Sequence, residues 1–127
     1  MLDLLARLTA IKSYAKDIHY NSSGESFYSI HLLMDRICEN LDDFSDSINE
    51  VYYLGSGQLP PSSKEVLKLS IAYIPSIFGV EYLKNLISTT VGCLDMLRTT
   101  ERADNSLLDS IAQDLKLKLG LLNRQTA

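Results

Sequence analysis

The sequence predicts an all-α protein, a bundle of four long helices with one short extra helix. Apolar residues recur three or four positions apart along almost the whole chain, a spacing that places them on one face of an α-helix. No segment alternates apolar and polar residues with period two, so strands are not expected. The 127 residues, 46% of them apolar and 22% charged, fit one globular domain. We therefore expect a single domain over residues 1–127.

The first two helices are expected over about Leu2–Tyr20 and from the next turn to about Tyr53. Ser22, followed three residues later by Glu25, predicts a capping box that starts the second helix. The second helix is expected to be unbroken as far as about Tyr53, where Leu54-Gly55-Ser56-Gly57 stops it and Pro60-Pro61 prevents its continuation. The inward stripe of the first helix is Leu4, Leu8, Ile11, Ala15 and Ile18, and that of the second is Phe27, Ile30, Met34, Ile37, Leu41, Phe44, Ile48 and Val51.

The second half of the chain predicts a short helix and two long ones. Ser62 and Glu65 form another capping box, which starts a short helix that continues through about Tyr73. The third long helix is expected from about Gly79, and Asp104-Asn105-Ser106 is expected to interrupt it and to cap the fourth. The inward residues are Leu83, Leu86, Ile87, Val91, Leu94 and Leu97 in the third helix, and Leu108, Ile111, Leu115, Leu119 and Leu122 in the fourth.

Charge and cysteine content exclude several classes of function. A net charge of -4 gives no electrostatic reason to bind nucleic acid. Cys38 and Cys93 are too few for a disulfide framework, so free thiols in a reducing compartment are expected. No signal peptide or membrane span is recognisable. We therefore expect a cytoplasmic protein.

Two pairs of polar residues in the second helix have the character of metal ligands. His31 and Asp35 are four positions apart, as are Asp46 and Glu50, so each pair shares a helix face. On one straight helix His31 and Asp46 would lie about 22 Å apart, too far to bind one ion. In an antiparallel dimer, however, His31 meets Glu50 and Asp35 meets Asp46 under one symmetry operation, because both pairs of residue numbers sum to 81.

The angular positions on an ideal helix agree with a shared site. With His31 at zero, Asp35 lies at about 40°, Asp46 at about 60° and Glu50 at about 100°, away from the helix's own apolar stripe. A solvated acidic face and a hydrogen-bonded histidine would explain the same residues without a metal. Imidazole and carboxylate are nevertheless the ligands that iron uses in helical bundles.

These residues belong to a longer motif. The stretch from His19 to His31 resembles the H-W-N-x-x-G-x-x-F-x-x-x-H signature of the Dps proteins, or miniferritins, and it continues as H-x11-H-x3-D-x10-D-x3-E through Asp35, Asp46 and Glu50. The turn after Tyr53 also resembles the one that closes the family's second helix. Tyr20 replaces the family's usual tryptophan, and the connection Thr99–Asn105 is shorter than in typical members.

The resemblance implies a ferritin-like four-helix bundle that forms an obligatory two-fold dimer and a hollow dodecamer. It implies a ferroxidase centre at the dimer two-fold, with His19, His31 and Asp35 from one subunit and Asp46 and Glu50 from the other. The centre would take iron, up to two ions per site. Iron(II) would be oxidised there, with hydrogen peroxide as the expected oxidant and dioxygen as the other candidate, and the product stored as mineral. Carboxylate ligands bind the harder ferric ion in preference to iron(II), which helps to drive the oxidation.

Two other functions compete with iron oxidation. One is a ferritin-like structural or interaction protein without iron chemistry, against which the complete ligand set argues. The other is a DNA-compacting protein, but the last six residues hold a single arginine and the subunit charge of -4 repels DNA. No DNA binding is expected.

Overall fold

Every regular element of the part of the chain that the structure describes, residues 1–77 and 79–125 of a computed structural model, is helical. The predicted all-α class is therefore confirmed. In chain order the elements are α1 (Leu2–Asn21), α2 (Phe27–Cys38), α3 (Leu41–Ser47), the π-helix η1 (Ile48–Tyr53), the 3-10 helix η2 (Leu54–Ser56), α4 (Ser63–Ser70), the 3-10 helix η3 (Ile71–Tyr73), α5 (Val80–Met96) and α6 (Arg102–Gln125).

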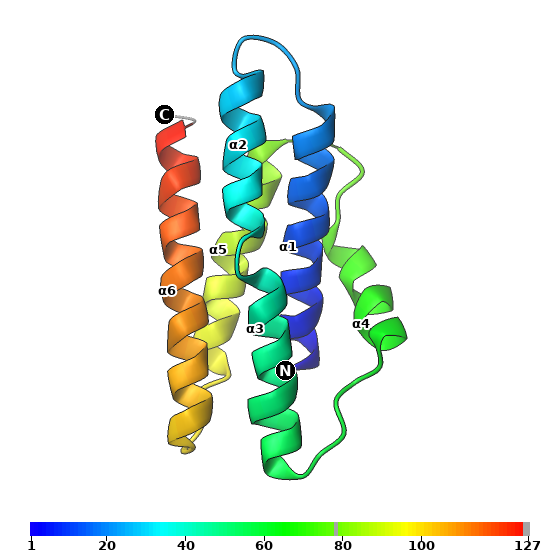
Figure 1. The fold of residues 1–127 in the computed structure, drawn as a ribbon, viewed down its shortest axis with the longest axis vertical. Helices are drawn as coiled ribbons and strands as arrows, with labels where there is room; N and C mark the ends of the chain where they lie inside the picture. The colour runs from blue at the N-terminus through cyan, green and yellow to red at the C-terminus, as the bar shows by residue number, and fades with distance from the viewer. Residues whose placement is uncertain (78, 126–127) are drawn as a thin grey trace.

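The long helices stand side by side in four columns (Figure 1). One column is α1, and a second consists of α2 with α3 and η1 continuing below it, while α5 and α6 are the other two. Helix α1 contacts α2, α3, α4 and α5, so it is the element around which the others pack. The short α4 lies on the outer side of α1.

The core sits between the columns, and α1 supplies most of it. All five residues of its predicted inward stripe are buried, and α1 covers the predicted range with one more residue at its end. In α2, α3 and η1 the stripe is buried at Met34, Ile37, Leu41 and Ile48, but its ends are exposed at Phe27 and Val51. No helix in the described ranges is long and apolar enough to cross a membrane.

The prediction of one unbroken second helix is wrong. Helix α2 ends at Cys38 and α3 begins at Leu41, and between them Asn40 adopts a left-handed conformation with φ 69°. Asparagine is one of the few residues besides glycine that tolerates this conformation. The capping box predicted at Ser22 is also wrong, because Ser22 ends α1 and α2 starts after Ser26 with no side-chain cap.

The break between α2 and α3 is fixed by α6. Lys118, which is fully buried, forms an ion pair of 2.7 Å with Asp114 one turn earlier and donates a hydrogen bond to the backbone carbonyl of Glu39. The Asn40 side-chain amide donates to Asp114 at 3.0 Å. A helix end leaves carbonyls without partners, and a buried ammonium satisfies one of them here. Four polar groups thus meet at the break between α2 and α3.

The predicted ends of the other helices are partly confirmed. Ser62 and Glu65 form the predicted capping box of α4, and Gly57 ends the second column with φ 72°. Helix α5 follows Gly79 as predicted. The predicted start of the last helix at Asp104-Asn105-Ser106 is wrong, since α6 begins at Arg102. The Asn105 side chain lies within α6 and bridges the preceding loop, because it accepts from the Thr99 N–H at 2.9 Å and donates to the Thr99 carbonyl at 2.8 Å.

Candidate metal centre

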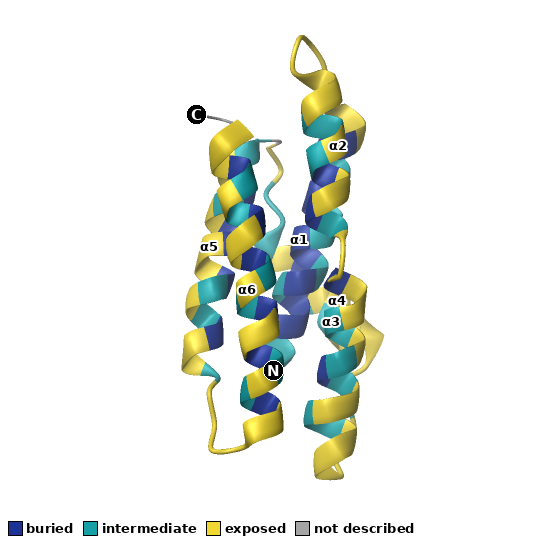
Figure 2. Cartoon of the chain, turned by 60° about the vertical axis from the view of Figure 1, so that its left-hand side comes forward, coloured by how far each residue is buried: buried dark blue, intermediate teal, exposed yellow. Residues whose placement is uncertain are grey.

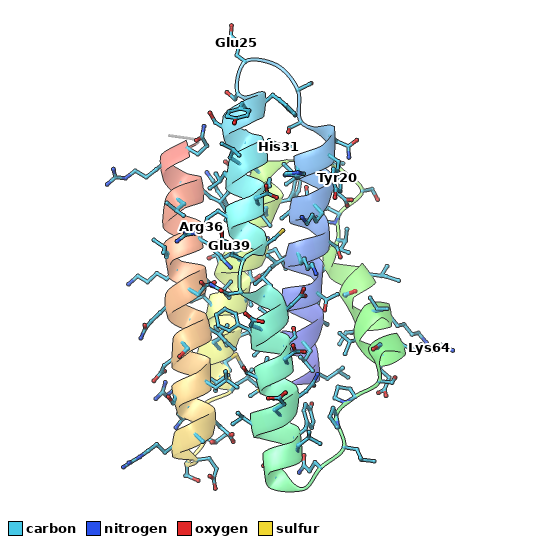
Figure 3. All side chains as sticks on the ribbon, in the orientation of Figure 1. Tyr20, Glu25, His31, Arg36, Glu39 and Lys64 are labelled. Carbon is cyan, nitrogen blue, oxygen red and sulfur yellow. The ribbon has the colours of Figure 1, made fainter. Side chains whose placement is uncertain are left out.

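The contact between α1 and α2 brings the two histidines of the chain together. His19 lies in the last turn of α1 and His31 in α2, and their rings stack with centroids 3.6 Å apart and planes inclined by 25°. Figure 3 shows His31 on the side of α2 that faces α1. The stacking follows from the short connection between the helices, which turns the chain back on itself at Asn21–Ser26.

Each histidine is oriented by the backbone of the other. Nδ1 of His19 is 2.9 Å from the carbonyl oxygen of His31, and Nδ1 of His31 is 3.2 Å from the carbonyl oxygen of His19. A carbonyl oxygen can only accept, so both Nδ1 atoms carry the proton. In the neutral rings both Nε2 atoms then present a free lone pair. A hydrogen bond from Nδ1–H to a carbonyl is the arrangement that prepares a histidine for metal ligation through Nε2.

The stacking decides how many ions the two rings could serve. A metal ion lies close to the plane of the imidazole that binds it, and two stacked rings with centroids 3.6 Å apart and planes inclined by 25° do not converge on a single ion. Each of the two histidines would therefore bind an ion of its own.

Asp35 lies beside the histidines and is held by a lysine. Its Oδ1 is 3.5 Å from Nδ1 of His19 and 3.8 Å from Nζ of Lys16. The carboxylate thus approaches His19 from the Nδ1 edge, and an ion at Nε2 would require this half-exposed side chain to rotate. Lys16 was not identified from the sequence. Its position three residues before His19, on the same face of one helix, is the signal that could have found it.

Two aromatic residues line the histidine pair. Tyr20 meets His19 edge-on with ring centroids 5.1 Å apart, and Phe27 lies 5.2 Å from His31. Tyr20 is 71% exposed. Within one chain, therefore, the aromatic rings border the histidines and leave the side towards solvent uncovered.

Asp46 and Glu50 lie in the lower part of the second column, on α3 and η1. Both are exposed, and neither carboxylate has a hydrogen-bond or ion-pair partner among the described residues. The prediction that they point away from their own core is confirmed. The ideal angles predicted for them do not apply, because the column breaks at Asn40 and continues as a π-helix around Glu50. Such π-helical turns are frequent at functional sites.

The predicted ligands therefore fall into two groups within one subunit. His19, His31 and Asp35 meet at the α1–α2 contact, whereas Asp46 and Glu50 lie apart from them on the exposed surface of α3 and η1. In the described ranges no set of three or more histidine, cysteine or acidic side chains is arranged to hold a metal ion. A complete ligand set would require a second chain.

Comparisons of this chain with protein-family models and with curated protein sequences give no match. Its similarity to the Dps proteins thus rests on the motif residues and their spacing.

Proposed function

We propose that this chain is a ferritin-like subunit that oxidises iron(II) at a site shared between two copies of itself. The proposal rests on the reciprocal hydrogen bonds between His19 and His31, which leave both Nε2 atoms free. Asp35 lies next to this pair, with its Oδ1 3.5 Å from Nδ1 of His19. His19, His31 and Asp35 would bind iron from one subunit, and Asp46 and Glu50 from the other. The resemblance implies a dodecameric cage, and the sequence predicts a cytoplasmic location.

The exposed surface of the second column supports the dimer. Tyr28, Leu32 and Leu54 are 69%, 49% and 58% exposed, and large apolar side chains on the surface of a small domain gain free energy when a partner covers them. The break at residues 39 and 40 lies next to the midpoint of the antiparallel pairing, which falls between residues 40 and 41. In that pairing α2 of one chain therefore lies opposite α3 and η1 of the other, and the break does not remove the symmetry.

The reaction is a balanced transfer of electrons from iron to peroxide. Two iron(II) ions each lose one electron, and one hydrogen peroxide takes up both electrons and two protons to give two waters. The ligand set favours this direction, because the three carboxylates Asp35, Asp46 and Glu50 stabilise the more highly charged ferric ions. Lys16 is paired with Asp35, so it would release that carboxylate when the cation binds.

The first experiment measures iron oxidation and mass together. The purified protein is given anaerobic iron(II) and then peroxide or dioxygen, while the absorbance of ferric iron is followed. Mass in solution is measured before and after loading. We expect a dimer or a multiple of it, two irons per shared site and fast oxidation. A folded monomer that binds no iron would overturn the proposal and would favour a helical interaction protein without iron chemistry.

A complementation experiment tests whether the site is shared. His31→Ala and Glu50→Ala chains are each expected to be inactive, because every site in either homodimer lacks a ligand. In a mixed dimer both substitutions fall in one of the two sites, so the other site is intact. Unfolding and refolding the two chains together should restore up to about half of the activity per mixed dimer. Mixed dimers that form and remain inactive would refute the shared site.

A further inference from the structure

Helix α6 has a second face that packs against nothing in the described part of the chain. Its inner stripe follows steps of three and four through Leu108, Ile111, Leu115, Lys118 and Leu122, all of which are buried. The outer stripe follows the same steps, four, three and four, through Gln113, Leu117, Gly120 and Arg124. These four residues therefore lie on one face of the helix, with Leu117 and Gly120 at its centre. Figure 2 turns α6 towards the viewer and shows exposed residues along it.

The outer stripe holds a shallow, wide-open hollow in the surface of α6. The hollow has a volume of about 760 Å³ and is lined by Gln113, Lys116, Leu117, Gly120, Leu121 and Arg124. Leu117 is 51% exposed. Gly120 lies between the two leucines, and a Cβ added to it would meet nothing within 4 Å. A glycine between larger residues lets the side chains of a neighbouring helix approach the backbone closely.

The charge of this hollow is opposite to that of the molecule. Residues 115–125 contain three cationic side chains and no acidic one, in a chain whose net charge is -4. Lys118 is buried and paired with Asp114, whereas Lys116 and Arg124 are exposed. Neither of these two has an ion-pair partner within residues 1–77 and 79–125. The hollow therefore combines apolar side chains with two free positive charges about 12 Å apart along the helix.

We propose that this hollow of α6 binds an amphipathic helix of another protein, one that carries acidic side chains beside an apolar stripe. An apolar side chain of that helix would sit over Gly120 between Leu117 and Leu121. Its acidic residues, seven or eight positions apart, would reach Lys116 and Arg124. None of the proposed iron ligands lies in this face, so the inference is independent of the proposed function.

Two other binding partners, a second copy of this chain and an anionic membrane, fit the charges of the hollow less well. A second copy of α6 lying antiparallel with Gly120 on the two-fold would place Lys116 opposite Arg124, and like charges in contact disfavour that pairing. An anionic membrane is recognised by clusters of about four to eight cations. The hollow has only two that are exposed.

The test uses a labelled synthetic peptide and the full chain. The peptide has about three heptads, with leucine at the a and d positions and glutamate at e and g. A control peptide replaces each glutamate by lysine. Fluorescence anisotropy is expected to show binding of the acidic peptide alone, and raised salt should weaken it because the charges lie at the surface.

Two variants assign the binding to the hollow. Gly120→Leu fills the hollow without a clash inside the chain, and leucine is a better helix former than glycine, so the variant should fold. The peptide should bind this variant at least about tenfold more weakly. Its matched control is Gly92→Leu on the exposed face of α5, where an added Cβ also meets nothing within 4 Å. Lys116→Glu should weaken binding similarly, and Lys64→Glu on α4 should not.

Several results would overturn the inference. One is the absence of binding by the acidic peptide, and another is equal binding of the lysine peptide. Equal losses for Gly120→Leu and Gly92→Leu would show that the hollow is not the binding surface. Self-association that Gly120→Leu abolishes would assign the face to a second copy. Binding to vesicles with anionic lipid, lost in the same variant, would assign it to a membrane.

Discussion

Replacing Lys118 by methionine is expected to destabilise the protein strongly, although it exchanges a charged residue for an apolar one in the core. Lys118 has a side chain that is 1% exposed, and its partner Asp114 is 17% exposed, with Nζ and Oδ2 2.7 Å apart. Methionine fills nearly the same space but leaves the Asp114 carboxylate and the Glu39 carbonyl without the ammonium. Removing one partner of a buried ion pair costs about 3–5 kcal/mol. The bond from Asn40 to Asp114 remains, so we expect the lower end, about 3 kcal/mol.

The assay is urea unfolding followed by far-ultraviolet circular dichroism. The transition midpoint should fall while the slope with urea stays the same, since the surface exposed on unfolding does not change. The matched control is Lys116→Met, two residues earlier and exposed, for which a change within about 0.5 kcal/mol is expected. The double variant Lys118→Met with Asp114→Leu should recover most of the loss, because it removes both charges. If Lys118→Met alone stays within about 1 kcal/mol of the original protein, the ion pair does not hold the break.

Three further outcomes are expected. Asn40→Ala should lower the free energy of unfolding by about 1–2 kcal/mol more than Asn40→Gly in the same urea assay, because only glycine adopts the left-handed conformation without strain. Burial acts to raise the pKa of Asp3, but hydrogen bonds from Tyr73 and Arg7 hold that pKa below its ordinary value of 3.8. The stabilisation by this carboxylate is therefore present above pH 3.8 and should be lost as the pH falls through the lower folded-state pKa, and Asp3→Asn should flatten this part of the stability profile. Replacing both Asp46 and Glu50 by alanine should abolish iron oxidation and leave the unfolding midpoint unchanged, and a large loss of stability would identify them as structural acids.

Local signals in the sequence determined several of the helix boundaries. The steps of three and four in α1, the capping box at Ser62 and Glu65, and Gly57 at the end of the second column all act over one or two turns. Each of them occurs in the structure where it was predicted. Their physical basis is short-range, because helix periodicity, side-chain caps and backbone conformation depend on residues a few positions apart.

The candidate site was predictable to the extent that it depends on one helix pair. The spacing of His19, His31 and Asp35 singled out residues that the α1–α2 contact brings together. The orientation of the two imidazoles by each other's carbonyls was not predictable, because it depends on how closely the helices approach. Lys16 was missed for a similar reason: its role appears only when Asp35 of the neighbouring helix is placed beside it.

Only the tertiary structure decided where the second column breaks. The apolar steps around residues 38–41 are those of a continuous helix, and no glycine or proline interrupts them. The break is stabilised by Lys118 and Asp114, more than 70 residues away in sequence. Lys118 likewise takes a core position that periodicity alone would give to an apolar residue, because its charge satisfies a helix end and a carboxylate. Interactions of this kind arise only when distant helices meet, and a one-dimensional pattern carries no information about that meeting.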